Sequence, residues 1–208
     1  MEKNEKLLKT LFSLYKNPYF CKGLCIYFLK TMIKILDRHF ELSIPHETIQ
    51  EKVKAVAEQL NKDYAGKYPV MVCILNGAFM FMADLVRYLD FQPEIVFARY
   101  SSYEGLSSTG VVKEVMGVNA NLLARDVIVV EDIVDTGTTM YSILPMFHDK
   151  GAKTVKIVTF LQKPDSLKVP LNVDYAAMKI PNDFVVGYGL DYNGMGRNLK
   201  DIYTVVEE

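Results

Sequence analysis

The segment Val127–Met140, VIVVEDIVDTGTTM, has the highest density of side chains that could take part in chemistry. Its first residues are apolar and predict a short buried strand, and the residues from Thr138 onward have the spacing of a helix. Backbone N–H groups at the start of a helix, with the positive end of the helix dipole, form an anion site. The residues that would surround such an anion are Asp135, Thr136, Gly137, Thr138 and Thr139. A glycine that permits close backbone approach and three hydroxyl groups favour a phosphate as the ligand.

Two carboxylates, Glu131 and Asp132, stand just before this loop and would repel a phosphate, so they need a separate explanation. Carboxylates accept hydrogen bonds from sugar hydroxyl groups, and Mg2+ binds a few carboxylate or hydroxyl oxygens together with substrate oxygens. The pair therefore predicts a ribose diol or a magnesium ion beside the phosphate. The alternative is that the acidic turn, with Asp135, only caps the following helix.

The elements that must position this loop follow from hydrophobic periodicity. Pro45 opens a helix in which apolar residues recur at helical spacing up to Leu60. The other expected elements are the strand Val70–Leu75, the turn Asn76–Gly77, the helix Ala78–Leu89, the strands Ile95–Ala98, Val127–Val130 and Val155–Leu161, and the helix Thr138–Lys150. Strands that are apolar on both faces and separated by helices predict an α/β fold with a parallel sheet covered on both sides. Ligands of such sheets bind beyond the carboxyl ends of the strands.

Composition favours a small-molecule ligand. The 208 residues allow one sizeable domain, and 24 Lys and Arg against 25 Asp and Glu leave no basic stripe for nucleic acid. Three cysteines, an odd number, indicate a reducing cytoplasm. We expect Cys21 and Cys25 to be ordinary thiols rather than zinc ligands, because no second Cys or His pair stands near them. The sequence has neither a G-x-x-x-x-G-K-[ST] phosphate loop nor a G-x-G-x-x-G dinucleotide loop after a strand.

The string EDIVDTGTT, Glu131–Thr139, resembles the signature with which type I phosphoribosyltransferases bind phosphoribosyl pyrophosphate (PRPP). The resemblance extends from about Leu36 to the C-terminus. It implies the type I phosphoribosyltransferase fold, a central mainly parallel sheet flanked by helices with a small hood subdomain, and it implies Mg2+ as the cofactor. It also implies that Asp135 is the general base, which takes the proton from N7 of a purine as N9 attacks the sugar.

Two further segments are similar to the hypoxanthine-guanine branch of that family, FLQKP around Lys163 and IPNDFVVGYGLDYNGMGR from Ile180 to Arg197. By that resemblance Lys163 donates to O6 of the purine, Phe184 stacks on the ring, and the backbone of Val185 meets the base edge. An ammonium group suits an exocyclic oxygen and opposes the amino group of adenine. The alternatives are a solvated loop lysine and an ordinary buried strand.

The same resemblance assigns the other site residues. Asp191 joins Glu131 and Asp132 as a magnesium ligand, and Arg197 reaches the pyrophosphate, a role that suits the bidentate pairing of a guanidinium with phosphate. The turn Asn76–Gly77 matches the pyrophosphate loop, where the family often has a cis peptide bond before a basic residue. Because asparagine carries no charge, backbone N–H groups should bind pyrophosphate here, and we expect a cis bond before Asn76.

Ser102 and Tyr103, with the glycine- and serine-rich run that ends at Gly110, resemble the mobile loop that closes over PRPP and excludes water. The alternative is a hairpin tip without a function. The implied activity is purine salvage, in which PRPP and hypoxanthine or guanine give IMP or GMP and pyrophosphate. We further expect no nucleic-acid or membrane partner, a cytoplasmic location, and a homodimer or homotetramer.

Residues 1–31 differ in texture from the rest, with six lysines and two glutamates among aromatic and aliphatic residues. We expect an extension to a phosphoribosyltransferase domain at residues 32–208, with Met32 as the natural start of the protein. The apolar run is too short for a membrane span, and it lacks the small-residue site of a signal peptide. The alternatives are a helix packed on the domain and a basic amphipathic helix on a membrane surface.

Three other functions stay open from the sequence. The first is a related transferase that uses another base, such as adenine or orotate. The second is a regulator that keeps the PRPP-binding fold and binds RNA, which the near-neutral charge disfavours. The third is a membrane-attached interaction protein that uses residues 1–31.

Overall fold

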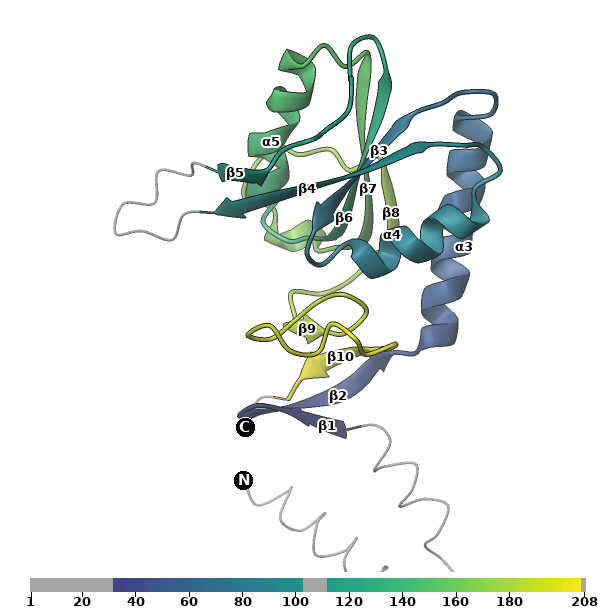
Figure 1. Cartoon of the computed structure of the whole chain (residues 1–208). Coiled ribbons are helices and arrows are strands. Elements are labelled where there is room, and N and C mark those ends of the chain that lie inside the picture. Colours follow the sequence, from purple (N-terminus) through teal and green to yellow (C-terminus); the bar gives the residue numbers. More distant parts are fainter. Residues whose placement is uncertain (1–31, 103–111, 207–208) are drawn as a thin grey trace, which may run out of the picture.

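The computed structural model describes residues 32–102 and 112–206. A six-stranded sheet in the order β5-β4-β3-β6-β7-β8 forms its centre (Figure 1). The strands are β3 (Val70–Leu75), β4 (Glu94–Ser102), β5 (Val112–Met116), β6 (Asp126–Val134), β7 (Thr154–Gln162) and β8 (Tyr175–Lys179). Neighbouring strands are parallel except β4 and β5, which are antiparallel. The predicted parallel sheet is confirmed, with β5 as an antiparallel edge strand.

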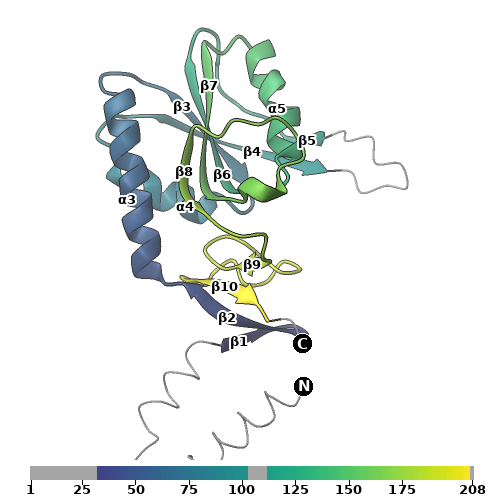
Figure 2. The ribbon, with the colours of Figure 1, turned by 180° about the vertical axis from the view of Figure 1, so that it is seen from behind.

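Helices cover both faces of this sheet. The helices α3 (His46–Asp63) and α4 (Phe79–Leu85) lie on one face and α5 (Thr138–Asp149) lies on the other, as Figures 1 and 2 show from opposite sides. Two short 3-10 helices, η1 (Val86–Tyr88) and η2 (Pro164–Ser166), follow α4 and β7. The helix expected at Ala78–Leu89 is therefore divided into α4 and η1.

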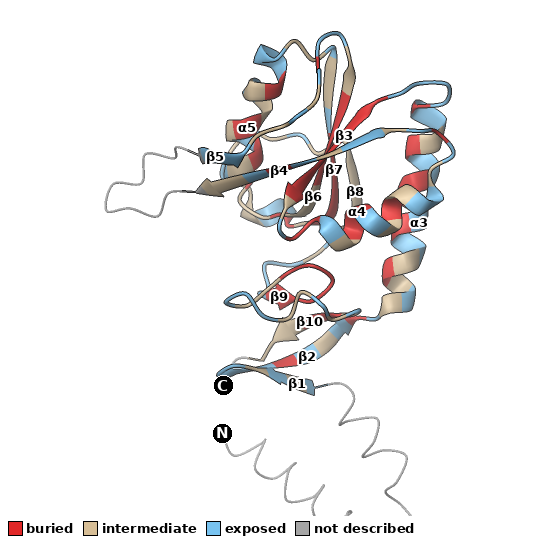
Figure 3. Ribbon diagram, viewed as in Figure 1, coloured by how far each residue is buried: buried red, intermediate tan, exposed pale blue. Residues whose placement is uncertain are grey.

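The strands alternate their side chains between two hydrophobic layers, which explains why their sequences are apolar throughout. Met71 and Cys73 of β3 are buried in the layer that contains α3 and α4, whereas Val70 and Val72 are buried in the layer that contains α5. Figure 3 shows the buried residues concentrated along these central strands. The apolar residues of α3 that recur at helical spacing, Ile49, Val53, Val56 and Leu60, are all buried, as predicted.

A second, antiparallel sheet forms the hood, with the strand order β1-β2-β10-β9. Its strands are β1 (Met32–Ile35), β2 (Arg38–Ile44), β9 (Val185–Val186) and β10 (Ile202–Val205). The hood thus joins the first described residues to the last ones, and Figure 1 shows it below the parallel sheet. Its own small core contains Phe40, Val186 and Tyr203. The predicted hood subdomain is confirmed.

Three parallel strands end at the edge of the sheet that faces the hood. Because β3, β6 and β7 are parallel neighbours, the residues that follow them must emerge on the same side. These residues are Asn76 after β3, Asp135 after β6 and Lys163 after β7. The parallel topology therefore brings three segments with predicted functions to one edge.

Candidate active site

Strand β6 carries the two carboxylates that precede the predicted phosphate loop. It continues beyond the apolar run, since Glu131 pairs with Thr159 of β7 and Val134 pairs with Gln162. Glu131 and Asp132 therefore lie within a strand and not in a turn before the helix. The residue at the N-cap of α5 is Gly137, and no side chain forms a cap hydrogen bond there. The alternative explanation, that Asp135 merely caps this helix, is wrong.

The start of α5 has the properties expected of an anion site. The first backbone N–H groups of a helix have no acceptor within the helix, and α5 begins without a side-chain cap. The hydroxyl oxygens of Thr136 and Thr138 lie 2.9 Å apart and are hydrogen bonded to each other. Thr138 is exposed and Thr139 is partly exposed. The start of α5 thus combines N–H groups that no side chain caps with threonine hydroxyls, which is the donor set that a phosphate requires.

Gly137 is required by the backbone and by its neighbours. Its φ is 76°, in the left-handed region that disfavours residues with a Cβ. A Cβ at this position would also lie 3.0 Å from Leu167 and 3.2 Å from both Val169 and Leu171. The segment that carries these side chains is tied to the loop because Lys168 N–H donates to the carbonyl of Thr136 (3.0 Å). The loop after β7 therefore packs against the phosphate loop and is hydrogen bonded to it.

Glu131 and Asp132 form a pair of adjacent carboxylates on β6. Oε2 of Glu131 is buried and has no hydrogen-bond partner. Burial raises the pKa of Glu131 well above its usual value, and the adjacent Asp132 raises it further. Burial also raises the pKa of Asp132, although Glu131, the N–H of Ile133 and the nearby Arg197 oppose that shift. The free protein therefore holds this pair at an energetic cost that a bound cation or a hydroxyl donor would reduce.

The turn after β3 lies directly against this pair. The peptide bond between Leu75 and Asn76 is cis, as we expected. Gly77 is buried, and a Cβ at this position would collide with Oδ2 of Asp132. The side chain of Asn76 is exposed. Only glycine at position 77 allows the predicted pyrophosphate loop to approach the carboxylates so closely.

The hood contributes Arg197 and Asp191 on the other side of the site. Nη2 of Arg197 lies 2.6 Å from Oδ1 of Asp191, and Nη1 donates to the carbonyl of Gly189 (2.7 Å). Asp191 also accepts from the N–H of Gly194 (2.6 Å). The charge of Arg197 lowers the pKa of Asp132. The structure thus places Arg197 beside Asp191 and close enough to Asp132 to act on its pKa.

Among the described residues, no three side chains of His, Cys, Asp or Glu cluster closely enough to hold a metal ion by themselves. This finding agrees with the coordination habits of Mg2+, which usually keeps several waters and takes one or two carboxylates together with substrate oxygens.

Lys163 and Asp135 form an ion pair in which Nζ lies 2.8 Å from Oδ2. The lysine side chain is only 7% exposed, whereas that of Asp135 is 44% exposed. Lys163 N–H also donates to the carbonyl of Val134 (2.9 Å), which holds the backbone after β7 against the end of β6. The alternative of a solvated loop lysine is wrong, because a buried ammonium group requires a partner. The sequence did not indicate this contact, since the two residues were assigned separate roles.

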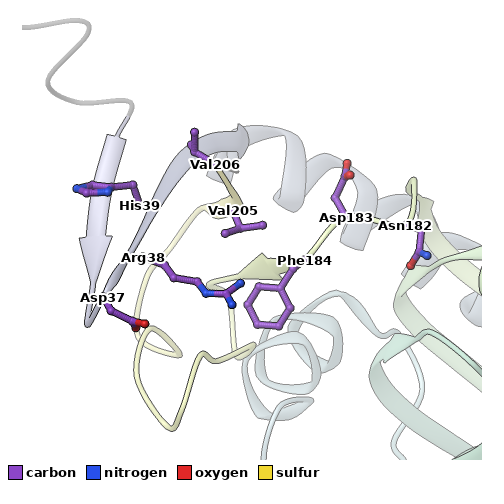
Figure 4. Close-up of a pocket in the computed structure, with 8 residues that line it drawn as sticks. All are labelled: Asp37, Arg38, His39, Asn182, Asp183, Phe184, Val205 and Val206. Carbon is purple, nitrogen blue, oxygen red and sulfur yellow. The ribbon is translucent and has the colours of Figure 1, made fainter. Parts of the chain in front are cut away.

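Phe184 and Val185 lie at the start of β9, on the hood. Val185 is buried and Phe184 is 43% exposed, and the rings of Phe184 and Tyr192 form a T-shaped pair with 5.9 Å between their centroids. Figure 4 shows Phe184 beside a cavity of about 710 Å3. The cavity is lined by Asp37, Arg38, His39, Asn182, Asp183, Phe184, Val205 and Val206. It includes neither Lys163 nor Asp135, so among the described residues that line it Phe184 alone has a predicted role.

Two predictions lie at or beyond the limits of the described residues. Ser102 is the last residue of β4, and Tyr103, with the rest of the predicted mobile loop, lies outside the described residues. Within the described ranges, no helix has the length and apolar character needed to cross a membrane.

Comparison with known proteins places the chain in a family. Residues 45–193 match the model of the phosphoribosyl transferase domain. The hypoxanthine-guanine phosphoribosyltransferase of Streptococcus pneumoniae is 45% identical over 166 residues, which cover 79% of this chain and 92% of that protein. The crystal structure of a hypoxanthine-guanine phosphoribosyltransferase from Bacillus anthracis has a TM-score of 0.76 and 39% identity, and the match covers 80% of this chain and 97% of that one.

A hypoxanthine phosphoribosyltransferase from Staphylococcus aureus is similar over a larger part of this chain. Its structure has a TM-score of 0.77 and 36% identity, and the match covers 89% of this chain and 96% of the other. Agreement in domain family, in sequence over most of both chains and in fold leads to one assignment. The chain belongs to the phosphoribosyltransferase family, within its hypoxanthine-guanine branch.

Proposed function

We propose that this chain transfers the 5-phosphoribosyl group of PRPP to N9 of hypoxanthine or guanine, giving IMP or GMP and pyrophosphate in purine salvage. The pair of Lys163 and Asp135, with 2.8 Å between Nζ and Oδ2, is the observation that carries this proposal. It presents a hydrogen-bond donor and an acceptor side by side. A 6-oxopurine presents the complement, the O6 acceptor next to N7–H, whereas adenine would place an amino donor opposite the ammonium group.

The remaining residues provide three subsites for PRPP. The 5-phosphate would bind the uncapped start of α5 through N–H groups and the hydroxyls of residues Thr136–Thr139. The ribose diol would donate to Glu131 and Asp132. The pyrophosphate would lie between the N–H groups of Asn76–Gly77 and the guanidinium of Arg197, which pairs well with phosphate oxygens. Ser102 and Tyr103 would belong to the loop that closes over the bound substrate.

The acidic residues fit a requirement for Mg2+. Glu131, Asp132 and Asp191 would hold the ion, together with oxygens of PRPP and water. The fit is supported by the buried, unpartnered Oε2 of Glu131 and by the raised pKa of both neighbouring carboxyl groups. When bound, the ion would neutralise charge on the leaving pyrophosphate.

The protein groups would then share the chemistry in the following way. As the bond to pyrophosphate breaks, positive charge develops on the sugar carbon, and the carboxylates that hold the ribose stabilise it. Asp135 takes the proton from N7 while N9 attacks. Phe184 and the backbone of Val185, with Lys163 at O6, hold the base in line with the sugar carbon.

The experiment that tests this function is an assay with PRPP and Mg2+ in which hypoxanthine, guanine, xanthine and adenine are offered in turn. Hypoxanthine and guanine should release pyrophosphate and form nucleotide, and adenine should not. Turnover of adenine alone would move the chain to another branch of the family. Binding of PRPP without turnover of any base would instead support a regulator.

We further propose that residues 32–208 form the catalytic domain, that the protein works in the cytoplasm, and that it assembles as a homodimer or homotetramer. Exposed apolar side chains on the edge strand β5 and on its neighbour β4, among them Ile95, Phe97, Val115 and Met116, support an interface between copies. Removal of residues 1–31 should leave a soluble, active enzyme. Light scattering should show the same number of subunits per assembly as for the full chain. Loss of folding or activity would show that the extension belongs to the domain.

A further inference from the structure

We propose that Tyr188 is a positioning residue that locks the hood turn Gly187–Leu190 onto α4 and thereby holds the pyrophosphate side of the PRPP site. This inference rests on the function proposed above and adds to it a residue that touches no substrate group. Three observations carry it: the conformation of the turn, the burial and hydrogen bonding of Tyr188, and the contacts that the turn makes with the site.

The turn itself has an unusual residue at its tip. It is closed by two hydrogen bonds of 3.0 Å between Gly187 and Leu190. The two central residues have positive φ, 48° for Tyr188 and 101° for Gly189, as in a type I′ turn. Glycine, asparagine and aspartate are the usual residues there, because a larger side chain strains the left-handed backbone. A tyrosine at this position indicates that contacts of its side chain offset the free-energy cost of the strained backbone.

The side chain of Tyr188 is held at both its ring and its hydroxyl. It is 1% exposed, and its ring packs on Phe160 of β7 with 4.9 Å between the centroids. The hydroxyl donates to Oδ2 of Asp84 on α4 (2.7 Å). Burial and this hydrogen bond raise the pKa of Tyr188, so the phenol stays a donor at neutral pH.

Asp84 connects the turn to two helices. Its Oδ2 also accepts a hydrogen bond from Nε2 of Gln50 on α3 (2.6 Å). The carboxylate is only 21% exposed and has one ion pair, with Arg87 at 3.5 Å. A partly buried carboxylate forms stronger hydrogen bonds than a neutral acceptor. Asp84 is therefore a suitable anchor that fixes the hood turn to the core of the protein.

The anchored turn makes two contacts with the proposed pyrophosphate site. Gly189 lies so close to the Asn76–Gly77 loop that a Cβ on it would collide with the carbonyl oxygen of Gly77. The carbonyl of Gly189 accepts from Nη1 of Arg197 (2.7 Å). Helix α4, which carries Asp84, begins two residues after Gly77. The hydrogen bond of Tyr188 to Asp84 thus closes a ring of contacts that runs through α4, the Asn76–Gly77 loop and the hood turn. The two groups proposed to bind pyrophosphate, the Asn76–Gly77 loop and Arg197, both contact this turn.

The variant Tyr188→Phe tests this role, since it removes the hydroxyl and keeps the ring. Loss of one charge-assisted hydrogen bond should raise the KM and the Kd for PRPP by about five- to tenfold. The KM for hypoxanthine should stay within about twofold of the parent value, because Lys163 and Asp135 do not belong to this ring of contacts. Steady-state kinetics and calorimetric titration with PRPP measure both effects.

Tyr175→Phe is the matched control. The hydroxyl of Tyr175 donates to Oδ2 of Asp63 (2.6 Å), and it joins β8 to the C-terminal end of α3, away from the site. This variant should keep the parent constants for both substrates. In a second pair, Asp84→Ala should reproduce the loss of PRPP affinity, and Asp84→Asn, which keeps an acceptor oxygen, should restore most of it.

Three results would overturn the inference: an unchanged PRPP affinity in a folded Tyr188→Phe protein, equal losses for PRPP and hypoxanthine, or the same kinetic change in the Tyr175→Phe control. Failure of the proposed function is recognised separately, because it concerns the parent protein. If the parent binds PRPP without turning over a purine, the function is wrong, and the calorimetric comparison between Tyr188→Phe and its control still decides the role of Tyr188.

Discussion

The two halves of the proposed PRPP site are built in different ways. The segment Glu131–Thr139 joins a central strand to a helix, so regular backbone hydrogen bonds hold its shape. The hood segment Gly187–Arg197 has no helix, and its backbone hydrogen bonds are those of tight turns. Its shape therefore depends also on residues with positive φ and on side-chain contacts such as those of Tyr188 and Arg197. We therefore expect substitutions in the first half to lower the rate of the reaction while the backbone keeps its conformation. In the second half, loss of one side-chain hydrogen bond should already displace the substrate groups.

Asp135→Asn should give the largest effect in the first half. Asparagine keeps the size of the side chain but cannot accept a full proton, and general-base help is worth about 10²- to 10⁴-fold in rate. Turnover should fall by that factor, while PRPP affinity should change little because N–H groups and hydroxyls hold the phosphate. Single-turnover measurement at saturating PRPP and hypoxanthine checks this. A rate within about threefold of the parent would mean that Asp135 is not the base.

Lys163→Ala should act on the base and not on PRPP. Hydrogen bonds to charged groups contribute roughly 1.5–3 kcal/mol, so the KM for hypoxanthine should rise by about 10- to 100-fold with a nearly unchanged Kd for PRPP. Lys156→Ala is the matched control, because Lys156 forms an equally short ion pair with Asp174 (2.7 Å) but is 46% exposed. Equal losses for both substrates would place Lys163 outside the base site.

Gly137→Ala tests whether the phosphate loop depends on its packing as well as on its backbone. Gly66 is a matched control, since its φ is 70° and nothing lies within 4 Å of an added Cβ. Both variants should lose about 1–2 kcal/mol from backbone strain. Gly137→Ala should lose roughly 1–3 kcal/mol more from contacts with Leu167, Val169 and Leu171, and should bind PRPP more weakly. Urea unfolding and PRPP titration measure the difference, and equal stabilities would contradict the packing argument.

Glu131→Gln should produce the smallest change in stability, and this change should be an increase. Because the folded-state pKa of Glu131 is raised, ionisation destabilises the parent as pH rises through that value. The variant avoids this cost, so its Tm at pH 7.5 without Mg2+ should be higher than that of the parent. The gain should vanish at a pH below the usual pKa of a glutamate, where Glu131 of the parent is protonated in both the folded and the unfolded state. The variant should use PRPP less well than the parent. A Tm below that of the parent at both pH values would contradict the inference that the ionised pair of Glu131 and Asp132 destabilises the fold.

Local patterns in the sequence predicted the framework well because they reflect local physics. Apolar runs between helical segments indicated a sheet buried on both faces, and the strand at Val70–Leu75 and the helix after Gly137 were predicted with nearly correct bounds. The end of β6 was placed too early. Its pairing with β7 continues through Glu131 and Asp132, and polar residues at a sheet edge conceal such a continuation from periodicity.

The sequence by itself determined the strand, loop and helix that carry Glu131–Thr139, together with the identity of the groups available to a phosphate and a purine. Only the tertiary structure decided that Lys163 contacts Asp135, 28 residues away, and that Tyr188 contacts Asp84, 104 residues away. It also decided that Gly77 lies against Asp132. The physical reason is that periodicity and turn chemistry act between near neighbours in the chain. Contacts between side chains on separate elements depend instead on how those elements pack.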